Sequence, residues 1–469
     1  MLAHSVWLLA GLALRGQVQH GGSAYPLSAL HPNLLDLADS APDVDSLLAQ
    51  DDDAAQSHQR RRKSLRVGAL VGARASLRNF SSVETAAGGK LFRLEVTSPG
   101  ALGLGLNLRR FHLPAGAKMF VYRSDGSDIH GAFTAANHKS YGGLSIVPTK
   151  GDAAIIELFV PAGTDPMAAS LELESVVHHY RDALFAQRCV GYGCAGECTV
   201  NVACPPGAGW RDQAAGVVQV LTSDGTTLCS AAMVNNLASD GRQLMLTASH
   251  CDQDPVGSAE DWIVLFGYQS PSCDNVPTEP SRNRTAQGTK LLARRGEFHR
   301  HPSDFALLEL TEAIPDEYGV WLNGFDASEA ESFSRPFGID HPRGDVKKLH
   351  ARDGNASVSG FFLPGTSHWL VDRWDVGTTE QGSSGSPLFD AAQRIRGQLN
   401  GGLSTCEDPV EDYYGRLAVS WELHSHERRG ADPDGDVLQP WLDPMGTARR
   451  VCNGTWLTDA RASAAQGIL

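Results

Sequence analysis

Short stretches dominated by apolar and β-branched side chains recur along this chain, and turn-forming residues separate them. In the first half these stretches cover residues 91–97, 118–122, 153–160 and 171–177. Short runs of this composition, bounded by Gly, Pro and Asp, are typical of β-strands. The spacing therefore predicts a β-sandwich-like unit within residues 91–188.

The same pattern continues in the second half, over residues 216–222, 229–235, 243–248, 262–268 and 305–310. Strands at such short intervals favour a β-barrel over parallel strands that alternate with helices. Only residues 437–442, near the C-terminus, have the pattern of a helix. We therefore expect an all-β protein.

The first 90 residues follow a different pattern. An apolar run at residues 6–14 predicts a signal peptide over residues 1–24, with a buried N-terminal helix as the alternative. Residues 34–66 are polar and contain blocks of like charge, which predicts a solvated linker within the segment 25–90. The basic run from Arg60 to Lys63 has two interpretations, an exposed flexible stretch or a processing site.

Charge and cysteine content divide the chain near residue 189. The net charge is -14, and essentially all of it belongs to residues 189–469, because residues 1–188 are almost neutral. An acidic chain argues against nucleic-acid binding and favours basic partners. All nine cysteines lie between Cys189 and Cys452, which indicates an oxidising compartment and secretion. No apolar stretch is long enough to predict a membrane span.

This division favours either two separately folding units or a removable leading segment before a disulfide-bonded enzyme. Three short segments of the second half contain the residue types of a nucleophilic triad, His250, Asp304 and Ser384. A serine hydroxyl is a poor nucleophile unless a histidine takes its proton and a carboxylate orients that histidine. We therefore expect Ser384 to attack, His250 to transfer the proton and Asp304 to orient His250.

The residues around Ser384 add a second element of this chemistry. Gly382 and Gly385 allow the backbone to turn sharply, so the N–H groups of Gly382 and Ser384 are expected to form an oxyanion hole. Taken singly, the histidine, the aspartate and the Gly-Ser-rich stretch each also fit a structural role. Their order along the chain, His before Asp before Ser, is that of chymotrypsin-like barrels.

At these residues the sequence resembles the chymotrypsin-like serine proteases and, more closely, the bacterial lysyl endopeptidases. The segments that carry the closer resemblance are CTVNVACP at 198–205, VNN at 234–236, SDFALLEL at 303–310, GSSGSPLFD at 382–390 and GQL at 397–399 before Gly401-Gly402. The resemblance extends from about Gly193 to Pro444, and residues 91–181 resemble the propeptide of that family.

The resemblance implies a chymotrypsin-like double β-barrel protease domain over residues 189–469, preceded by a β-sandwich-like propeptide domain at 91–188. It implies a secreted serine endopeptidase, made as a precursor, that cuts after Lys, with Arg left open as a second choice. The expected partners are peptide substrates with basic side chains and the protein's own propeptide, and the expected state is a monomer without cofactor or metal. Two alternatives remain, a protease of other specificity and a catalytically inactive, protease-like binding protein.

Substrate choice depends on where the pocket holds an acid. Trypsin-like pockets place it six residues before the nucleophile, where this chain has Thr378. In lysyl endopeptidases the acid lies in a later segment, and it carries over to Asp412, with an exposed loop acid as the alternative interpretation. The resemblance also implies that Asn400, Gly401 and Gly402 form the edge that pairs with the substrate backbone.

One departure from the family leaves the choice between Lys and Arg open. Asn400 stands where the family has an aromatic-stacked histidine, and the aromatic partner of that histidine is expected near Phe361 and Phe362. A second departure concerns activation. Chymotrypsin-type zymogens mature when a new N-terminus pairs with an acid next to the nucleophile, but Ser383 occupies that position. We expect instead that the leading segment assists folding and covers the cleft, and that the enzyme itself removes it by a cut after Arg188.

The resemblance pairs six of the cysteines as Cys198–Cys406, Cys204–Cys273 and Cys229–Cys251. Cys189, Cys194 and Cys452 remain, and one arrangement joins Cys194 to Cys452. Their spacing is not that of a finger-type zinc site, so we expect no metal there.

Overall fold

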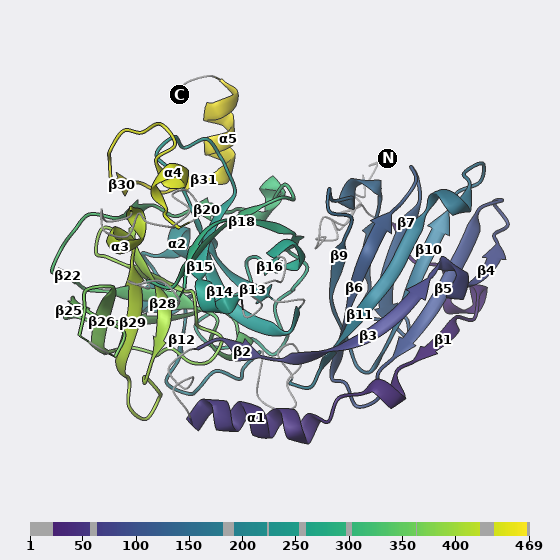
Figure 1. Cartoon of the computed structure of the whole chain (residues 1–469), viewed down its shortest axis with the longest axis horizontal. Helices are drawn as coiled ribbons and strands as arrows, with labels where there is room; N and C mark the ends of the chain where they lie inside the picture. The colour runs from purple at the N-terminus through teal and green to yellow at the C-terminus, as the bar shows by residue number, and fades with distance from the viewer. Residues whose placement is uncertain are drawn as a thin grey trace, which may run out of the picture.

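The computed structural model describes residues 22–56, 63–181, 192–222, 225–252, 259–296, 303–362, 364–422 and 436–466. Almost all of the expected signal peptide, and also Arg188 and Cys189, lie outside the described residues. The described chain forms two β-rich bodies that lie side by side (Figure 1). The all-β class predicted from the sequence pattern is therefore confirmed.

The N-terminal body consists of two sheets. One sheet runs in the order β1 (Asn33–Asp36), β5 (Lys90–Thr97), β10 (Ala153–Val160), β7 (Lys118–Arg123) and β8 (His130–Phe133), with β4 (Ser81–Glu84) also on β5. The other runs in the order β3 (Gly68–Ser76), β11 (Ser170–His179), β6 (Gly103–His112) and β9 (Leu144–Lys150). The inward side chains of both sheets, such as Leu94, Leu106 and Val176, form one hydrophobic core.

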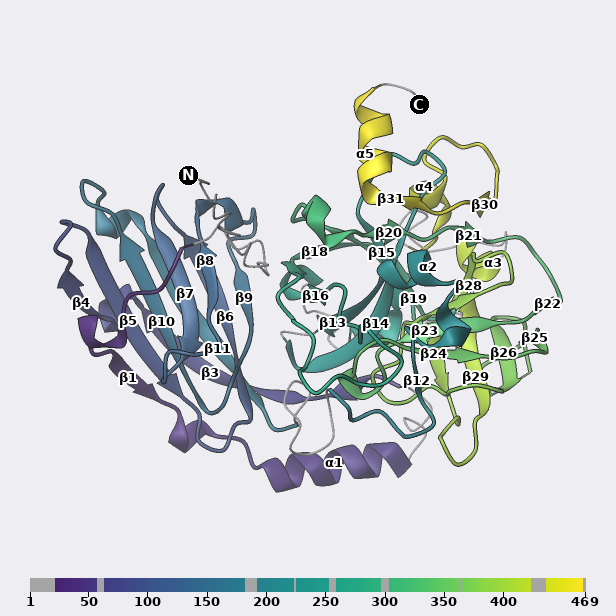
Figure 2. The same cartoon turned by 180° about the vertical axis from the view of Figure 1, so that it is seen from behind.

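In the C-terminal body one sheet carries the first half-barrel (Figure 2). It runs in the order β17 (Thr285–Gln287), β16 (Ile263–Leu265), β13 (Val217–Thr222), β14 (Thr227–Val234), β15 (Leu244–Ala248), β19 (Phe305–Leu310) and β18 (Thr289–Arg295). The short strand β2 (Leu65–Arg66), from the leading part of the chain, pairs with β14. The strands predicted from the pattern in this part of the chain are thus present within a few residues of their expected bounds.

A second, larger sheet carries the other half-barrel. It runs in the order β12 (Val200–Asn201), β24 (Lys348–Ala351), β23 (Phe337–Asp340), β27 (Pro387–Phe389), β28 (Ile395–Gly402), β29 (Val410–Arg416), β26 (His368–Arg373), β25 (Asn355–Ser359) and β22 (Ser332–Ser334). β21 (Phe325–Asp326) pairs with β28, and β30 (Val451–Cys452) pairs with β21, while β20 (Trp321–Leu322) pairs with β31 (Thr455–Trp456). The double β-barrel expected from the resemblance is therefore present.

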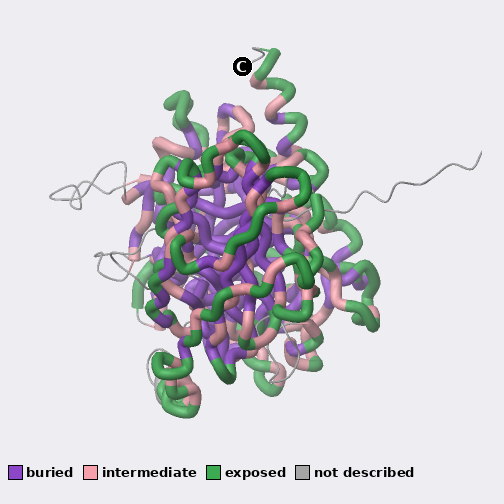
Figure 3. The backbone as a smooth tube through the Cα atoms, turned by 90° about the vertical axis from the view of Figure 1, so that its right-hand side faces the viewer, coloured by how far each residue is buried: buried purple, intermediate pink, exposed green. Residues whose placement is uncertain are grey.

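Helices contribute little to this body. The described ones are α2 (Arg211–Ala215), α3 (Leu417–Trp421), α4 (Gln439–Leu442) and α5 (Leu457–Ala465). α4 lies within the expected helix at residues 437–442, whereas α5 was not expected. Only Leu457 and Ala460 of α5 are buried, so its sequence has no continuous apolar face that would have predicted it. Figure 3 shows buried positions concentrated in the interior and exposed ones on the surrounding loops. None of the helices in the described residues could cross a membrane.

The prediction of a solvated linker over residues 34–66 is wrong. β1 pairs in parallel with β5, and residues 44–56 form helix α1 (Val44–Gln56), which lies under both bodies in Figures 1 and 2. The side chains of β1 are mostly exposed, so its backbone pairing leaves no apolar signal in the sequence. Asp51 of α1 accepts hydrogen bonds from Arg66, Tyr180 and Arg181, which holds this polar helix in place.

The disulfides found in the described residues are Cys198–Cys406, Cys204–Cys273 and Cys229–Cys251, the same pairs that the resemblance implies. Cys452 is a buried, free thiol that donates to the carbonyl of Asn236, and burial raises the pKa of Cys452 to about 11. The arrangement in which Cys452 pairs with Cys194 is therefore wrong.

Candidate active site

The structure brings His250, Asp304 and Ser384 together between the two half-barrels, although 54 and 134 residues separate His250 from the other two. His250 Nδ1 lies 2.6 Å from Asp304 Oδ2, and His250 Nε2 lies 2.7 Å from Ser384 Oγ. The backbone N–H of His250 also donates to Asp304 Oδ1 at 3.1 Å. All three residues are buried. This geometry lets one imidazole bond a hydroxyl and a carboxylate at once.

Local structure fixes the imidazole and the carboxylate. His250 lies in a short 3-10 turn, η9 (Ser249–Cys251), which directly follows the fully buried strand β15. The Cys229–Cys251 disulfide ties that turn to β14, and Asp304 stands immediately before β19, the partner of β15. The backbone N–H of Ser249 donates to the carbonyl of Asp304 at 2.8 Å. Three neighbouring strands therefore determine how these two side chains meet.

The turn around Ser384 requires glycine. Gly385 has φ +82°, and a Cβ there would lie 2.1 Å from Thr247 Oγ1 and 2.4 Å from the carbonyl oxygen of Ser230. Gly382 has φ +96°, in the same left-handed region that favours glycine. The backbone N–H groups of Gly382 and Ser384 converge on one atom, the carbonyl oxygen of Lys63, at 2.5 and 3.2 Å.

Near this turn, Asp412, Thr379 and Ser404 surround the ammonium of Lys63, and we call the site that these three residues form the pocket. Asp412 is 0% exposed, so its interpretation as an exposed loop acid is wrong. Its Oδ2 atom accepts hydrogen bonds from Trp374 Nε1 at 2.7 Å and from Thr379 Oγ1 at 2.8 Å. Its Oδ1 atom faces the ammonium of Lys63 at 3.0 Å. A buried carboxylate with one oxygen held by neutral donors can pair its other oxygen with a cation.

The Lys63 side chain fills this pocket. Its Nζ donates to the carbonyl oxygens of Thr379 at 3.1 Å and Ser404 at 3.0 Å, and it also contacts Thr379 Oγ1. Thr378, at the position where trypsin-like pockets have their acid, bonds the hydroxyl of Ser404. Nothing in the sequence pattern indicated that Lys63, in a polar stretch far from the pocket along the chain, would reach it.

Asn400, Gly401 and Gly402 form the end of β28, next to the pocket. Gly402 is in register with Asp412, and a Cβ on Gly402 would lie 2.1 Å from Asp412 Oδ1, so glycine keeps the pocket open. Pairing of this edge with a substrate backbone stays a prediction, because residues 57–62, which precede Lys63, lie outside the described residues.

His368 is a residue of this region that sequence reasoning missed. Its Nε2 lies 3.0 Å from the side-chain amide of Asn400, and its ring lies 5.4 Å from that of Phe361. An imidazole beside an aromatic ring is therefore present, although it comes from β26 and not from position 400. Burial lowers the pKa of His368 to about 4, and the negative charge of Asp304 opposes that shift only in part. No sequence signal could have found His368, because it begins an ordinary strand.

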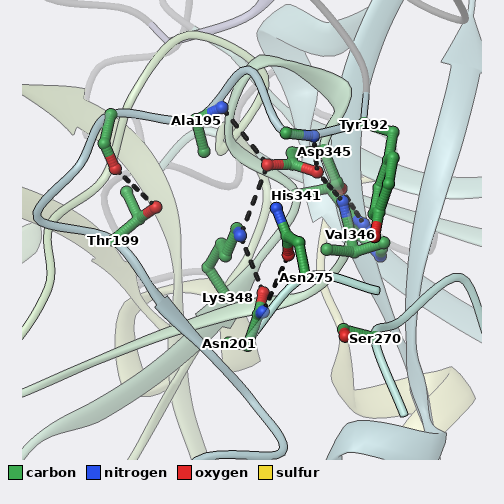
Figure 4. Close-up of polar contacts among 12 residues, drawn as sticks. Tyr192, Ala195, Thr199, Asn201, Ser270, Asn275, His341, Asp345, Val346 and Lys348 are labelled. Atoms are coloured by element: carbon green, nitrogen blue, oxygen red, sulfur yellow. Dashed lines mark hydrogen bonds and ion pairs between the residues drawn. The ribbon is translucent and has the colours of Figure 1, made fainter. Parts of the chain in front are cut away.

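Asp345 holds the segment that follows residue 191 (Figure 4). Its carboxylate accepts from the backbone N–H groups of Gly193 at 2.8 Å and Ala195 at 3.2 Å, and it pairs with Lys348 at 3.3 Å. Glu380 accepts from the N–H of the next residue, Gly196, at 2.8 Å. Two acids therefore fasten this segment to the barrel through neutral backbone donors.

A hydrogen-bonded chain connects Asp345 with the turn around Ser384. The carbonyl oxygen of Asp345 accepts from His341 Nδ1 at 2.9 Å, and the backbone N–H of His341 donates to Ser230 Oγ at 2.9 Å. Ser230 Oγ in turn donates to the carbonyl of Gly382 at 3.0 Å. Burial, together with the charge of Lys347, lowers the pKa of His341 to about 3, so this imidazole is neutral near pH 7. In the described residues no group of three or more His, Cys, Asp or Glu could hold a metal ion.

Comparison with solved structures finds overlaps with part of this chain. The serine endoprotease from Yersinia pestis has a TM-score of 0.31 and 18% identity, covering 45% of this chain and 61% of that chain. The thermostable serine protease AL20 from an extremophilic microorganism has a TM-score of 0.32 and 16% identity, covering 43% of this chain and 91% of that chain.

Sequence comparison is more informative. A curated lysyl endopeptidase from Pseudomonas aeruginosa is 31% identical over 317 residues, and the match spans 64% of this chain and 64% of the relative. The family model of the lysyl endopeptidase N-terminal domain matches residues 41–180, and that of the lysyl endopeptidase C-terminal domain matches residues 192–415. The two matches follow each other and together span most of the chain, so this protein belongs to the lysyl endopeptidase family.

Proposed function

We propose that this chain is the precursor of a serine endopeptidase that cuts peptide bonds after Lys. The observation that carries the proposal is the position of Lys63. Its ammonium faces Asp412 at 3.0 Å, its carbonyl oxygen accepts from Gly382 and Ser384, and its own N–H lies 2.9 Å from Ser384 Oγ. The first two contacts are those that a lysyl residue would need on the acyl side of a bond under attack, and the third places Ser384 Oγ next to that residue.

In the proposed reaction, Ser384 Oγ attacks the carbonyl carbon while His250 Nε2 takes the hydroxyl proton, across their 2.7 Å contact. Asp304 holds the Nδ1 tautomer of His250 and stabilises the imidazolium that forms. The negative charge on the carbonyl oxygen develops where the two N–H groups of Gly382 and Ser384 already point. Loss of one such donor typically costs about 10²- to 10³-fold in kcat. His250 then protonates the leaving amine, and water releases the acyl group by the reverse path.

We propose that Lys is preferred over Arg. The Lys63 ammonium has oxygens of Asp412, Thr379 and Ser404 around it at 3.0 to 3.1 Å and also contacts Thr379 Oγ1, so each of its three N–H donors has an acceptor. A guanidinium is planar and longer, so it would have to displace this set of oxygens to reach Asp412. Arg is therefore expected to be cut more slowly than Lys, and side chains without a charge more slowly still.

We further propose that residues 25–188 act as a propeptide and that the chain is exported. The lysyl endopeptidase N-terminal domain model matches within that range, and disulfides in the C-terminal body suit an oxidising compartment. The alternative of a catalytically inactive, protease-like binding protein is disfavoured. Such a protein would not need a hydroxyl, an imidazole and a carboxylate that are hydrogen-bonded one to the next.

Replacement of Ser384 by Ala tests the activity, with Ser334→Ala, an exposed serine on β22, as the matched control. We expect Ser384→Ala to lose hydrolysis of lysyl peptides and esters and to lose labelling by a fluorophosphonate, while Ser334→Ala retains both. A peptide library then measures the preference for Lys over Arg. Hydrolysis of lysyl esters by Ser384→Ala at the unsubstituted rate would refute the proposed nucleophile.

A further inference from the structure

The stretch from Lys63 to Arg66 runs through the candidate active site as a bound peptide would. Beyond Lys63, β2 pairs antiparallel with β14, with Leu65 opposite Leu228 and Arg66 opposite Thr227. The N–H of Val67 continues the pairing, because it donates to the carbonyl of Thr226 at 2.8 Å. Addition of an extended peptide to a sheet edge is a common mode of peptide recognition. Backbone hydrogen bonds thus also hold the chain on the Ser64 side of Lys63.

We propose that Lys63–Ser64 is a bond that the precursor cuts in itself, and that the segment Lys63–Arg66 blocks the active site until it has been cut. The inference rests on the proposed function, because it uses the same nucleophile and the same pocket. It assigns a processing site within the leading part of the chain, in addition to the one expected after Arg188.

The burial of Lys63 argues against a fortuitous contact. Its side chain is only 5% exposed, and lysine is almost never buried unless its charge is compensated. The interpretation of this part of the basic run as an exposed stretch is therefore wrong for Lys63. Three sites contact this one residue: Asp412 in the pocket, the N–H groups of Gly382 and Ser384, and Ser384 Oγ. If a different residue of the segment stood at this position, these three contacts would be hard to form together.

The cut proceeds by the acyl-enzyme steps given above. Ser384 Oγ forms a bond with the carbonyl carbon of Lys63, and its proton passes to His250 Nε2. The bond between that carbon and the nitrogen of Ser64 then breaks, and the same proton passes to this nitrogen, which becomes a new N-terminal amine. Water hydrolyses the ester, which leaves a carboxylate on Lys63 and restores the Ser384 hydroxyl. No further reactant is required.

Contacts on both sides of the bond keep the products in place. The piece that ends at Lys63 stays attached through β1, which pairs with β5, and through Asp51, which bonds Arg66 and Arg181. The piece that begins at Ser64 continues into β3 of the N-terminal body. The new amine therefore remains near the acyl group, which favours religation and slows net hydrolysis. The cut piece is expected to stay bound until the rest of the propeptide is removed.

Occupancy of the pocket is tested with dansylcadaverine, a fluorescent probe that carries a primary ammonium on a lysine-like alkyl stem. In the full chain with Ser384→Ala, Lys63 should exclude this probe. In the full chain with both Ser384→Ala and Lys63→Gln, the probe should bind, while Ser384→Ala with Lys150→Gln, an exposed lysine, should still exclude it. Equal binding of the probe to all three chains would overturn the occupancy.

Cleavage is tested on the full chain with Ser384 intact, by N-terminal sequencing and intact mass over time. We expect a piece that begins at Ser64, formed at a first-order rate that does not change over a 100-fold dilution. Lys63→Gln should abolish this N-terminus, and Lys63→Arg should delay it. The inference is overturned if the processed chain hydrolyses lysyl esters but no N-terminus at Ser64 forms at any time. Absence of any lysyl esterase activity would instead refute the proposed function.

Discussion

Replacement of Asp412 by Asn removes the pocket charge with almost no change of shape, so it isolates the electrostatic part of substrate choice. In the structure each carboxylate oxygen has its own task. Oδ2 accepts from Trp374 and Thr379, and Oδ1 faces the ammonium of Lys63. An asparagine has only one oxygen, so it can perform only one of these tasks.

Both orientations of the amide are unfavourable. If the amide oxygen faces Trp374 and Thr379, the NH₂ group faces the substrate ammonium, donor against donor. If the amide oxygen faces the ammonium instead, the NH₂ group faces Trp374 and Thr379, and these two donors lose their acceptor. Truncation of one partner in a buried, hydrogen-bonded charge pair typically costs about 2 to 5 kcal/mol. At 1.36 kcal/mol per factor of ten, we expect kcat/KM for lysyl substrates to fall by about 30- to 5,000-fold.

The assay compares lysyl and norleucyl peptides, with all chains first processed by immobilised trypsin, because Asp412→Asn should also process itself poorly. Asp408→Asn, an exposed acid in the same segment, is the matched control and should keep the full rate. Norleucine has a lysine-like stem without the charge, so Asp412→Asn should cut it no more slowly than the unsubstituted enzyme does. An equal loss toward lysyl and norleucyl peptides, with fluorophosphonate labelling of Ser384 intact, would refute the charge-pairing argument.

Three further predictions concern stability, measured by urea unfolding of the Ser384→Ala chain. Joint replacement of Cys229 and Cys251 by Ala opens a loop with a sequence separation of 22, which should cost about 3 kcal/mol, and an unchanged midpoint would contradict this. Gly385→Ala should cost at least about 2 kcal/mol because of its positive φ and its Cβ clash, whereas Gly446→Ala, with φ +63° and open space around it, should cost clearly less. Protonation of His368 favours the unfolded chain, because its folded-state pKa of about 4 is below the usual value near 6.5. The free energy of unfolding should therefore fall as the pH decreases from about 6.5 to 4.5, and His368→Gln should reduce this fall by about 2 to 3 kcal/mol; an identical pH dependence in both chains would refute it.

The strands and the grouping of His250, Asp304 and Ser384 were predictable because their signals are local. β15 and β19 are short apolar runs, and each carries its functional residue at one end, so pairing of the two strands is enough to bring His250 and Asp304 together. The glycines on either side of Ser384 likewise indicate a tight backbone turn from the sequence alone. Asp412 was found only through the family resemblance, because an acid in a strand gives no sign of burial.

The features that could not be predicted depend on contacts between distant parts of the chain. Helix α1 has a polar sequence and is positioned by Asp51, whose partners Arg66, Tyr180 and Arg181 lie as far as 130 residues away. Lys63 is buried only because a pocket built from residues more than 300 positions later receives it. A charge run therefore looks solvated in the sequence even where one of its members is an internal ligand.

If the chain is the precursor that we propose, the anchoring of residues 193–196 explains why it would need an occupant in its active site. Asp345 and Glu380 bind backbone N–H groups of Gly193, Ala195 and Gly196, and backbone amides are available before any cut creates a new N-terminus. The N–H groups of Gly382 and Ser384 accordingly converge on the carbonyl oxygen of Lys63 while residues 193–196 are still part of the uncut chain. A chymotrypsin-type zymogen stays inactive because the turn that carries the corresponding N–H groups is incomplete until the ammonium of a new N-terminus binds beside it. In this chain neutral backbone amides hold the segment instead, so that form of inhibition is absent. Inhibition would then have to come from occupancy of the site, which is the role that we propose for the stretch from Lys63 to Arg66.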